Sequence, residues 1–199
     1  MEVLKIKLEK LGYKVSYFDK KEEATEYISD EINGKNVGFG ASVTLRDMGL
    51  YEKLSENNNV VWHWNVPQGK TEFDMRNEAR TTDIYISSVN AIAKTGEIIN
   101  IDGTGNRIAE TEFGHKKVYL IVGVNKVADN FEAALHRARN VAAPKNAQRL
   151  NRKTPCAVKG DKCYNCNSPE RICRALSVFW CKPSSCEYEV ILINENLGY

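Results

Sequence analysis

Short apolar runs of β-branched and aromatic residues alternate along this chain with segments whose apolar residues repeat at helical spacing. Strand-like runs are predicted at residues 13–18, 37–40, 60–64, 83–89, 117–124 and 187–194. Helices are predicted between them, at residues 2–11, 20–33, 73–82, 107–113 and 129–142. Because a parallel strand pair needs a crossover, usually a helix, this alternation predicts an α/β fold whose parallel sheet is covered on both faces.

Capping and breaking residues predict where several helices begin and end. Asp19 is expected to cap the helix at 20–33, and Ser42 or Thr44 the helix that follows the second strand. Pro144 disfavours helical geometry at the residue before it, so Ala143-Pro144 is expected to end the helix at 129–142.

Residues 91–101 depart from this alternation. Two apolar arms flank Lys94-Thr95-Gly96-Glu97, and the glycine can adopt the positive φ that tight turns require. The segment therefore predicts a β-hairpin inserted into the parallel fold.

The charge balance and the lack of long apolar runs exclude several classes of protein. The chain has 28 Lys and Arg against 26 Asp and Glu, which argues against a nucleic-acid partner held by a general basic field. No apolar run approaches the ~20 residues of a membrane helix, and the N-terminus lacks a signal-peptide core. We expect a cytoplasmic protein without a membrane span. In the expected organisation, residues 1–150 form the α/β domain, and residues 151–199 form a cysteine-rich segment and a final strand packed on it.

Two glycine-containing loops stand where a strand leads into a helix, at residues 38–42 and 103–107. Backbone N–H groups at such a junction can face an anion, although tight turns need glycine equally. Val43 and Ile108 occupy positions where the dinucleotide-binding fingerprint requires glycine. The loops therefore indicate an anion site or close packing, and not a dinucleotide site.

The second loop carries more polar groups than a turn needs, namely Asp102, Asn106 and Arg107. The planar guanidinium of Arg107 could clamp a carboxylate or phosphate, or pair with Asp102. His63, His115 and His136 lack metal-ligand spacing, and each is expected to be half-buried or exposed. No Gly-x-Ser-x-Gly motif is present, so the sequence assigns no catalytic residue.

All six cysteines lie between Cys156 and Cys186, and the first 155 residues contain none. Clustered thiols in a reducing compartment more often bind metal or perform redox chemistry than form disulfides. Four of them follow a C-x6-C-x2-C-x6-C pattern: Cys156, Cys163, Cys166 and Cys173. Residues 145–182 hold nine Lys and Arg against two acids, a basic surrounding that suits a thiolate centre. Spacing alone leaves an iron–sulfur cluster, zinc and free redox thiols open.

Several motifs together resemble the lactate-utilisation (LUD) domain family over nearly the whole chain. They are Ser42-Val43-Thr44-Leu45-Arg46, Ser88-Val89-Asn90-Ala91-Ile92, Asn100–Arg107, Gly123-Val124-Asn125-Lys126, Ala142–Ala147, Thr154-Pro155-Cys156, Cys163–Cys173 and Asn194–Tyr199.

The resemblance implies a fold like that of CoA transferases and sugar-phosphate isomerases, with a Rossmann-like sheet and a hairpin insertion. It also implies a part in iron–sulfur-dependent oxidation of L-lactate to pyruvate, beside iron–sulfur or flavin partner subunits. On this basis we expect a 4Fe–4S cluster, with zinc as the alternative, on Cys156, Cys163, Cys166 and Cys173.

Two features depart from what the resemblance implies. Related CoA transferases carry a glutamate nucleophile after the strand that matches residues 84–88, whereas Ser88-Val89-Asn90 supplies none. Covalent CoA transfer is therefore not expected. Cys181 and Cys186 are additional to the four cysteines of the family pattern.

Open α/β sheets bind ligands at the carboxyl ends of their strands, so the pocket is expected there. The expected lining residues, for a small anionic metabolite, are Gly40, Ser42, Asn90, Asp102, Gly103, Gly105, Asn106 and Arg107. Two alternatives remain: a hydrolase or isomerase of a phosphorylated or CoA-linked small molecule, and a zinc-stabilised subunit that assembles a complex without catalysis.

Overall fold

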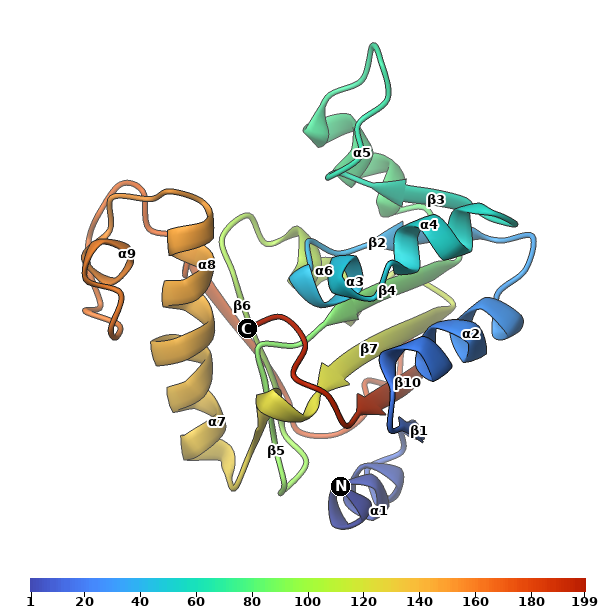
Figure 1. Ribbon diagram of the computed structural model, residues 1–199, viewed down its shortest axis with the longest axis horizontal. Helices are drawn as coiled ribbons and strands as arrows, with labels where there is room; N and C mark the ends of the chain where they lie inside the picture. The colour runs from blue at the N-terminus through green and yellow to red at the C-terminus, as the bar shows by residue number, and fades with distance from the viewer.

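The computed structural model describes residues 1–199 of the chain. Its larger sheet has six strands, all parallel, in the order β1-β10-β7-β4-β2-β3 (Figure 1). The strands are β1 (Lys14–Phe18), β2 (Asn36–Phe39), β3 (Asn59–Trp62), β4 (Ile84–Ser88), β7 (Lys117–Gly123) and β10 (Glu187–Ile193). They match the predicted runs to within two residues, so the predicted parallel α/β fold is confirmed.

A smaller sheet of four strands, in the order β8-β5-β6-β9, packs against the larger one. The predicted hairpin is present as β5 (Ala91–Ala93) and β6 (Ile98–Asp102), which pair antiparallel. β8 (Val127–Ala128) lies along β5, and β9 (Ala175–Phe179) lies along β6. β9 was not predicted, because its first two residues are exposed and its sequence lacks a regular apolar alternation.

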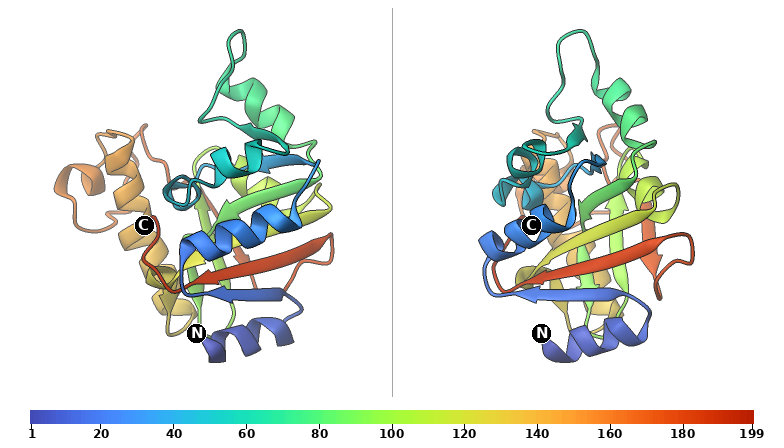
Figure 2. Two further views of the ribbon diagram at one scale, coloured as in Figure 1. Left: turned by 45° about the vertical axis from the view of Figure 1, so that its right-hand side comes forward. Right: turned by 90° about the vertical axis from the view of Figure 1, so that its right-hand side faces the viewer.

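Helices cover both faces of this pair of sheets. They are α1 (Glu2–Lys10), α2 (Lys21–Glu31), α3 (Val43–Asp47), α4 (Leu50–Ser55), α5 (Glu72–Ala79), α6 (Asn106–Glu112), the 3₁₀ turn η1 (Val124–Lys126), α7 (Phe131–Arg137), the π-helical turn η2 (Ala138–Ala142), α8 (Ala143–Arg149) and α9 (Pro155–Lys159). α2, α3 and α4 pack on one face of the larger sheet, and α1 packs beside the smaller sheet on the other (Figures 1 and 2). α7 covers the outer face of the smaller sheet. No helix combines the length and apolar character that a membrane span requires.

The prediction that Ala143-Pro144 ends a helix is wrong. The chain stays helical from Phe131 to Arg149, with the π-helical turn η2 just before the proline. Pro144 occupies the start of α8, where its missing N–H does not interrupt the hydrogen bonding. The wider turn therefore lets the helix pass a residue that would otherwise break it.

The two predicted caps had opposite outcomes. Ser42 caps α3, since its Oγ accepts a hydrogen bond from the Leu45 amide at 3.3 Å. Asp19 does not cap α2, because its carboxylate accepts hydrogen bonds from Tyr17 and Asn194, and Lys20 takes the cap position. The side chain of Glu23 accepts a hydrogen bond from the Lys20 amide, which satisfies one of the backbone donors of that end.

Candidate functional site: a cationic pocket at the carboxyl ends of the strands

A pocket of about 560 Å³ opens at the carboxyl ends of the parallel strands. Residues that follow β2, β3, β4 and β7 form its floor, and these include Ser42, His63, Asn90 and Lys126. The β6–α6 loop, the end of α8 and residues 169–174 of the cysteine segment form its walls. The tail after β10 runs back across this edge of the sheet, between α8 and α3 (Figure 1), and Gly198 lines the pocket.

The pocket brings together most of the residues predicted for it. Ser42, Asn90, Asp102, Gly103, Asn106 and Arg107 line it, whereas Gly40 and Gly105 do not. Gly40 packs against β4, where an added Cβ would lie 2.6 Å from Ser87 Oγ. Gly105 precedes α6 with a φ of +90°, a left-handed conformation that favours glycine.

The amides of the β6–α6 loop are directed at a carboxylate of the chain itself. Asp102 Oδ1 accepts hydrogen bonds from the amides of Gly103 and Thr104, and Asp102 Oδ2 accepts from those of Arg107 and Ile108. Asp102 thus occupies the anion position at the start of α6, where the helix dipole also favours negative charge. The loop amides are therefore not counted among the groups available to a ligand.

The guanidinium of Arg107 is likewise engaged by the protein. Its Nη1 donates to Ser88 O at 3.1 Å and Asn100 Oδ1 at 2.6 Å, and its Nη2 donates to Asn90 Oδ1 at 3.0 Å and Ile101 O at 2.6 Å. No ion pair joins it to Asp102, so the predicted pair is absent, while the predicted clamp of a carboxylate or phosphate stays a prediction. Arg107 instead ties the end of β4 to β6.

Lys126 is a pocket residue that the sequence analysis did not single out. It ends the turn η1 directly after β7, and its side chain is almost fully buried. Its Nζ lies 2.7 Å from Thr44 Oγ1 and 2.7 Å from Ser88 Oγ, and no carboxylate forms an ion pair with it. Burial, together with the cations Arg137 and Arg107, lowers the pKa of Lys126 to about 7, although Asp47 opposes the shift.

A neutral histidine lies at the other side of the pocket. Burial, assisted by the nearby Arg76, lowers the pKa of His63 to about 4. His63 is 6% exposed, so the prediction of a half-buried or exposed side chain is wrong for it. Its position after β3, in a run of aromatic residues, resembled core strand in the sequence and gave no sign of the pocket.

Two further arginines offer positive charge at the pocket wall. Arg149 packs over the Trp64 ring, with 4.8 Å from Cζ to the ring centroid, and hydrogen-bonds to Asn146 within its own helix. Arg152 is exposed, and none of the ion pairs or side-chain hydrogen bonds of the protein involves its guanidinium. Arg76, by contrast, is paired with Glu72 at 2.6 Å. Arg171 and Arg174 also line the pocket, but both donate to backbone carbonyls of the cysteine segment. The groups left for a ligand are therefore Lys126, Arg149 and Arg152.

The cysteine segment lies beyond α8 and closes one wall of the pocket, with Cys173 among the lining residues (Figure 1). Arg171 organises it by donating to the carbonyls of Cys166 and Cys173 at 2.9 and 2.8 Å. Cys163 Sγ accepts a hydrogen bond from the Asn165 amide at 3.3 Å and lies 3.8 Å from Arg139 Nη2. These donors suit thiolates.

The thiols themselves do not converge. All six cysteines are free, and the four of the predicted pattern are half-buried. No group of three or more His, Cys, Asp and Glu side chains is positioned to hold a metal ion. The donor set therefore fits a thiolate centre by its chemistry, while the structure gives no geometry for one.

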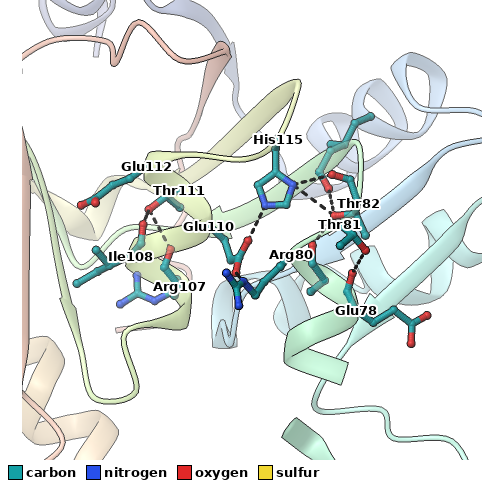
Figure 3. Close-up of polar contacts among 12 residues, drawn as sticks. Glu78, Arg80, Thr81, Thr82, Arg107, Ile108, Glu110, Thr111, Glu112 and His115 are labelled. Atoms are coloured by element: carbon teal, nitrogen blue, oxygen red, sulfur yellow. Dashed lines mark hydrogen bonds and ion pairs between the residues drawn. The ribbon is translucent and has the colours of Figure 1, made fainter. Parts of the chain in front are cut away.

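At the opposite, amino ends of the strands, a buried acid and a histidine form a closed network (Figure 3). His115 Nε2 lies 2.9 Å from Glu110 Oε2, and His115 Nδ1 lies 2.8 Å from the Thr82 carbonyl oxygen. The ring stacks on Tyr85, with 5.0 Å between centroids, and Arg80 lies 3.6 Å from Glu110. His115 is 5% exposed, again against the prediction, and its contacts join α6 to Thr82 and Tyr85 at the start of β4.

A family model described as LUD domain matches residues 1–193. Among solved structures, a DUF162 family protein from Deinococcus radiodurans aligns with a TM-score of 0.56 and 12% identity, covering 96% of this chain and 94% of that one. This likeness extends over the entire fold.

Other solved structures align with only part of the chain. They include eIF2B beta from Chaetomium thermophilum, with a TM-score of 0.40 and 12% identity, covering 56% of this chain and 44% of that one. Ribose 5-phosphate isomerase from Plasmodium falciparum aligns with a TM-score of 0.34 and 16% identity, covering 55% of this chain and 52% of that one. Among curated proteins, none matches the sequence.

Proposed function

The chain belongs to the LUD domain family and is a lactate-utilisation type of protein, and from this premise we propose that its pocket binds a small organic anion. The observation that carries the proposal is the surplus of cations at the pocket. Lys126 is buried there without a carboxylate partner, and Arg149 and Arg152 stand at the wall. Burial without a counter-ion favours the neutral form of the Lys126 amine, and a bound carboxylate would balance the positive charge of the two arginines.

The proposed role is in the oxidation of L-lactate to pyruvate, carried out together with iron–sulfur or flavin subunits. Lactate and pyruvate are both monocarboxylates, so a single cationic site can hold substrate or product. In this proposal the chain's own residues bind and orient the acid: the arginines attract the carboxylate, and the buried floor excludes water from the carbon that reacts. The pocket residues that directly follow β4 are Val89 and Asn90, and neither is an acyl-transfer nucleophile.

Isothermal titration calorimetry with L-lactate and with pyruvate tests this proposal. We expect either acid to bind, and Arg149→Ala and Arg152→Ala each to weaken the affinity by about tenfold, or roughly 1.4 kcal/mol. Lys35→Ala is the matched control, since Lys35 is exposed just before β2, at the other end of the strands. Equal affinity in all four proteins, or no binding of either acid, would contradict the proposal.

The volume of the pocket favours a second candidate. Pockets of ~300–1,000 Å³ usually take ligands of drug size, and about 560 Å³ exceeds what a three-carbon acid fills. A phosphorylated or CoA-linked small molecule would use the same cations and more of the space, as substrate of a hydrolase or isomerase. Calorimetry with coenzyme A and a sugar phosphate beside the two acids separates the candidates by which anion binds more tightly.

We also propose that Cys156, Cys163, Cys166 and Cys173 hold a 4Fe–4S cluster, with zinc as the alternative. The support is the donor set, namely four half-buried thiols on one segment with N–H and guanidinium donors beside the Cys163 sulfur. When bound, a cluster would supply one-electron transfer at the pocket wall.

Anaerobic purification followed by iron, sulfide and zinc analysis tests the cofactor. Cys163→Ser and Cys166→Ser should each lose the metal, whereas Cys181→Ser and Cys186→Ser should retain it. Zinc without sulfide would favour a subunit that assembles a complex, and equal metal loss from all four variants would refute the proposed ligand set.

A further inference from the structure

The amine of Lys126 is held by two hydroxyl groups that can only accept its hydrogens. Ser88 Oγ donates its own proton to Ile121 O at 2.6 Å, and Thr44 Oγ1 donates to Leu197 O at 3.3 Å. Each hydroxyl has a single proton, so both must accept from Lys126 Nζ in the two 2.7 Å contacts. Two of the positions around the nitrogen are therefore fixed as N–H donors.

The third position of the nitrogen carries the lone pair whenever the amine is neutral. Lys126 lines the pocket together with Thr44 and Ser88, and its Nζ makes no other hydrogen bond or ion pair, so no protein group occupies this third position. The charged groups near it are Arg137 of α7, Arg107 of α6 and Asp47 at the end of α3. Two cations against one acid favour the neutral amine, as does burial, and a neutral buried amine is a nucleophile.

We propose that Lys126 is a reactive amine that condenses with the carbonyl group of a compound bound in the pocket, such as a 2-oxo acid. The Nζ lone pair attacks the carbonyl carbon and a C–N bond forms. The carbonyl oxygen then leaves as water, taking both hydrogens of the amine, and a C=N bond remains. No oxidant or reductant is needed. Uptake of one proton from water gives the protonated imine, whose single N–H can donate to Ser88 or Thr44.

The choice of an anionic carbonyl compound rests on the proposed function, since Arg149 and Arg152 are the groups that would hold a carboxylate. The reactivity of the amine itself rests only on the contacts of Lys126. The two claims can therefore fail separately, and the experiment is arranged to tell them apart.

The test is reductive trapping with cyanoborohydride near pH 7.5, using glyoxylate as an anionic aldehyde and acetaldehyde as a neutral one. Modified lysines are located by peptide mass spectrometry, and Lys145, which is exposed on α8, is the internal reference. At this pH an ordinary lysine is almost fully protonated, so we expect Lys126 to be modified at least roughly tenfold faster than Lys145. Lys126→Met should abolish this fast modification, and Lys126→Arg, which keeps the charge, should abolish it as well.

The ratio of Lys126 to Lys145 modification separates the claims. A high ratio with both reagents, and higher with glyoxylate, supports the reactive amine and the anion pocket together. A high but equal ratio supports the amine and contradicts the anion pocket. A ratio near one with both reagents overturns the reactive amine, and calorimetric binding of glyoxylate in that case would leave the proposed function standing.

Discussion

The two ends of the parallel strands bury charge in different ways. At the amino ends, Glu189 of β10 is fully buried, yet Lys14 and Lys117 lie 3.1 and 3.0 Å from its carboxylate, and Tyr27 and Ser16 donate hydrogen bonds to it. At the carboxyl ends, Lys126 is buried to a similar degree and no acid is paired with it. Protein groups thus compensate the buried charge at the amino ends of the strands, whereas the buried amine at the carboxyl ends has no counter-ion.

This difference indicates which edge serves the stability of the fold and which serves a ligand. A buried charge with partners from several strands links those strands, as Glu189 does for β1, β7 and β10. A buried charge without a counter-ion lowers stability, so its presence is understandable where a ligand or a reaction uses it. Arg107 belongs to the first kind although it lines the pocket, because protein oxygens accept from both of its terminal nitrogens.

The largest expected effect on stability is that of Arg107→Ala, because protein oxygens accept hydrogen bonds from both terminal nitrogens of the Arg107 side chain. Arg107→Ala would remove a charged donor from Ser88 O, Ile101 O and the side-chain oxygens of Asn90 and Asn100. We expect a loss of about 3 kcal/mol in the free energy of unfolding. Urea denaturation measures it. Arg107→Lys should lose less, since one charged donor remains. An unchanged midpoint in Arg107→Ala would refute the structural role.

The next largest effect is the pH dependence of the free energy of unfolding that is due to Lys126. Its pKa is about 7 in the folded protein and near 10.5 when unfolded, so between these values the unfolded chain holds a proton that the folded one lacks. Stability should therefore rise with pH across this window, by about 1.4 kcal/mol per pH unit at most. The difference in unfolding free energy between wild type and Lys126→Met, measured at pH 7 and 8.5, isolates this contribution. A difference independent of pH would contradict the lowered pKa.

A smaller effect on stability is expected for Glu189, the compensated charge at the amino ends of the strands. Burial alone would raise the pKa of Glu189, but hydrogen bonds from Tyr27 and Ser16 and the two lysines hold it below its ordinary value. Glu189→Gln should cost about 1–2 kcal/mol at neutral pH. Because the folded pKa is lowered, this advantage of wild type should be present above pH 4.5 and disappear as the pH falls through the folded value. A loss that persists in acid would show that packing, and not charge, sets the difference.

The smallest effect on stability is expected for Arg152→Ala. Arg152 is exposed and contributes no side-chain hydrogen bond or ion pair, so the free energy of unfolding should change by less than about 0.5 kcal/mol. Thermal denaturation of this variant, compared with that of Lys35→Ala, checks the value. A large loss of stability would mean that Arg152, like Glu189, has partners in the folded protein that stabilise its charge.

The sheet could be predicted from the sequence because it follows from local apolar periodicity. The position of the pocket could be predicted because open α/β sheets bind ligands at the carboxyl ends of their strands. The runs at 84–88 and 117–123 were apolar enough to be recognised, and residues that follow them line the pocket. β9 and the continuation of helix through Pro144 were not readable, since the first depends on pairing with a distant strand and the second on a π-helical turn.

Lys126 was missed for a different reason. Its motif, Gly123-Val124-Asn125-Lys126, was recognised, but nothing in those four residues tells whether the lysine is buried. The burial arises from Thr44, Ser88 and the tail at Leu197 and Gly198, which come from three other parts of the chain. The sequence signal that could have been used is a lysine three residues after the end of an apolar strand, at the carboxyl ends of the strands, where open α/β sheets bind ligands.

The central claim, that an uncompensated amine lies at the carboxyl edge of the sheet, can be tested most directly by titrating that amine. Protein carrying ¹³C at the lysine Cε positions would be followed by NMR from pH 5 to 11, with Lys126→Arg to assign the signal. We expect one resonance that titrates near pH 7 and is absent from the variant. If the Lys126 resonance titrates above pH 10, the amine is compensated and the contrast between the two ends of the strands is wrong.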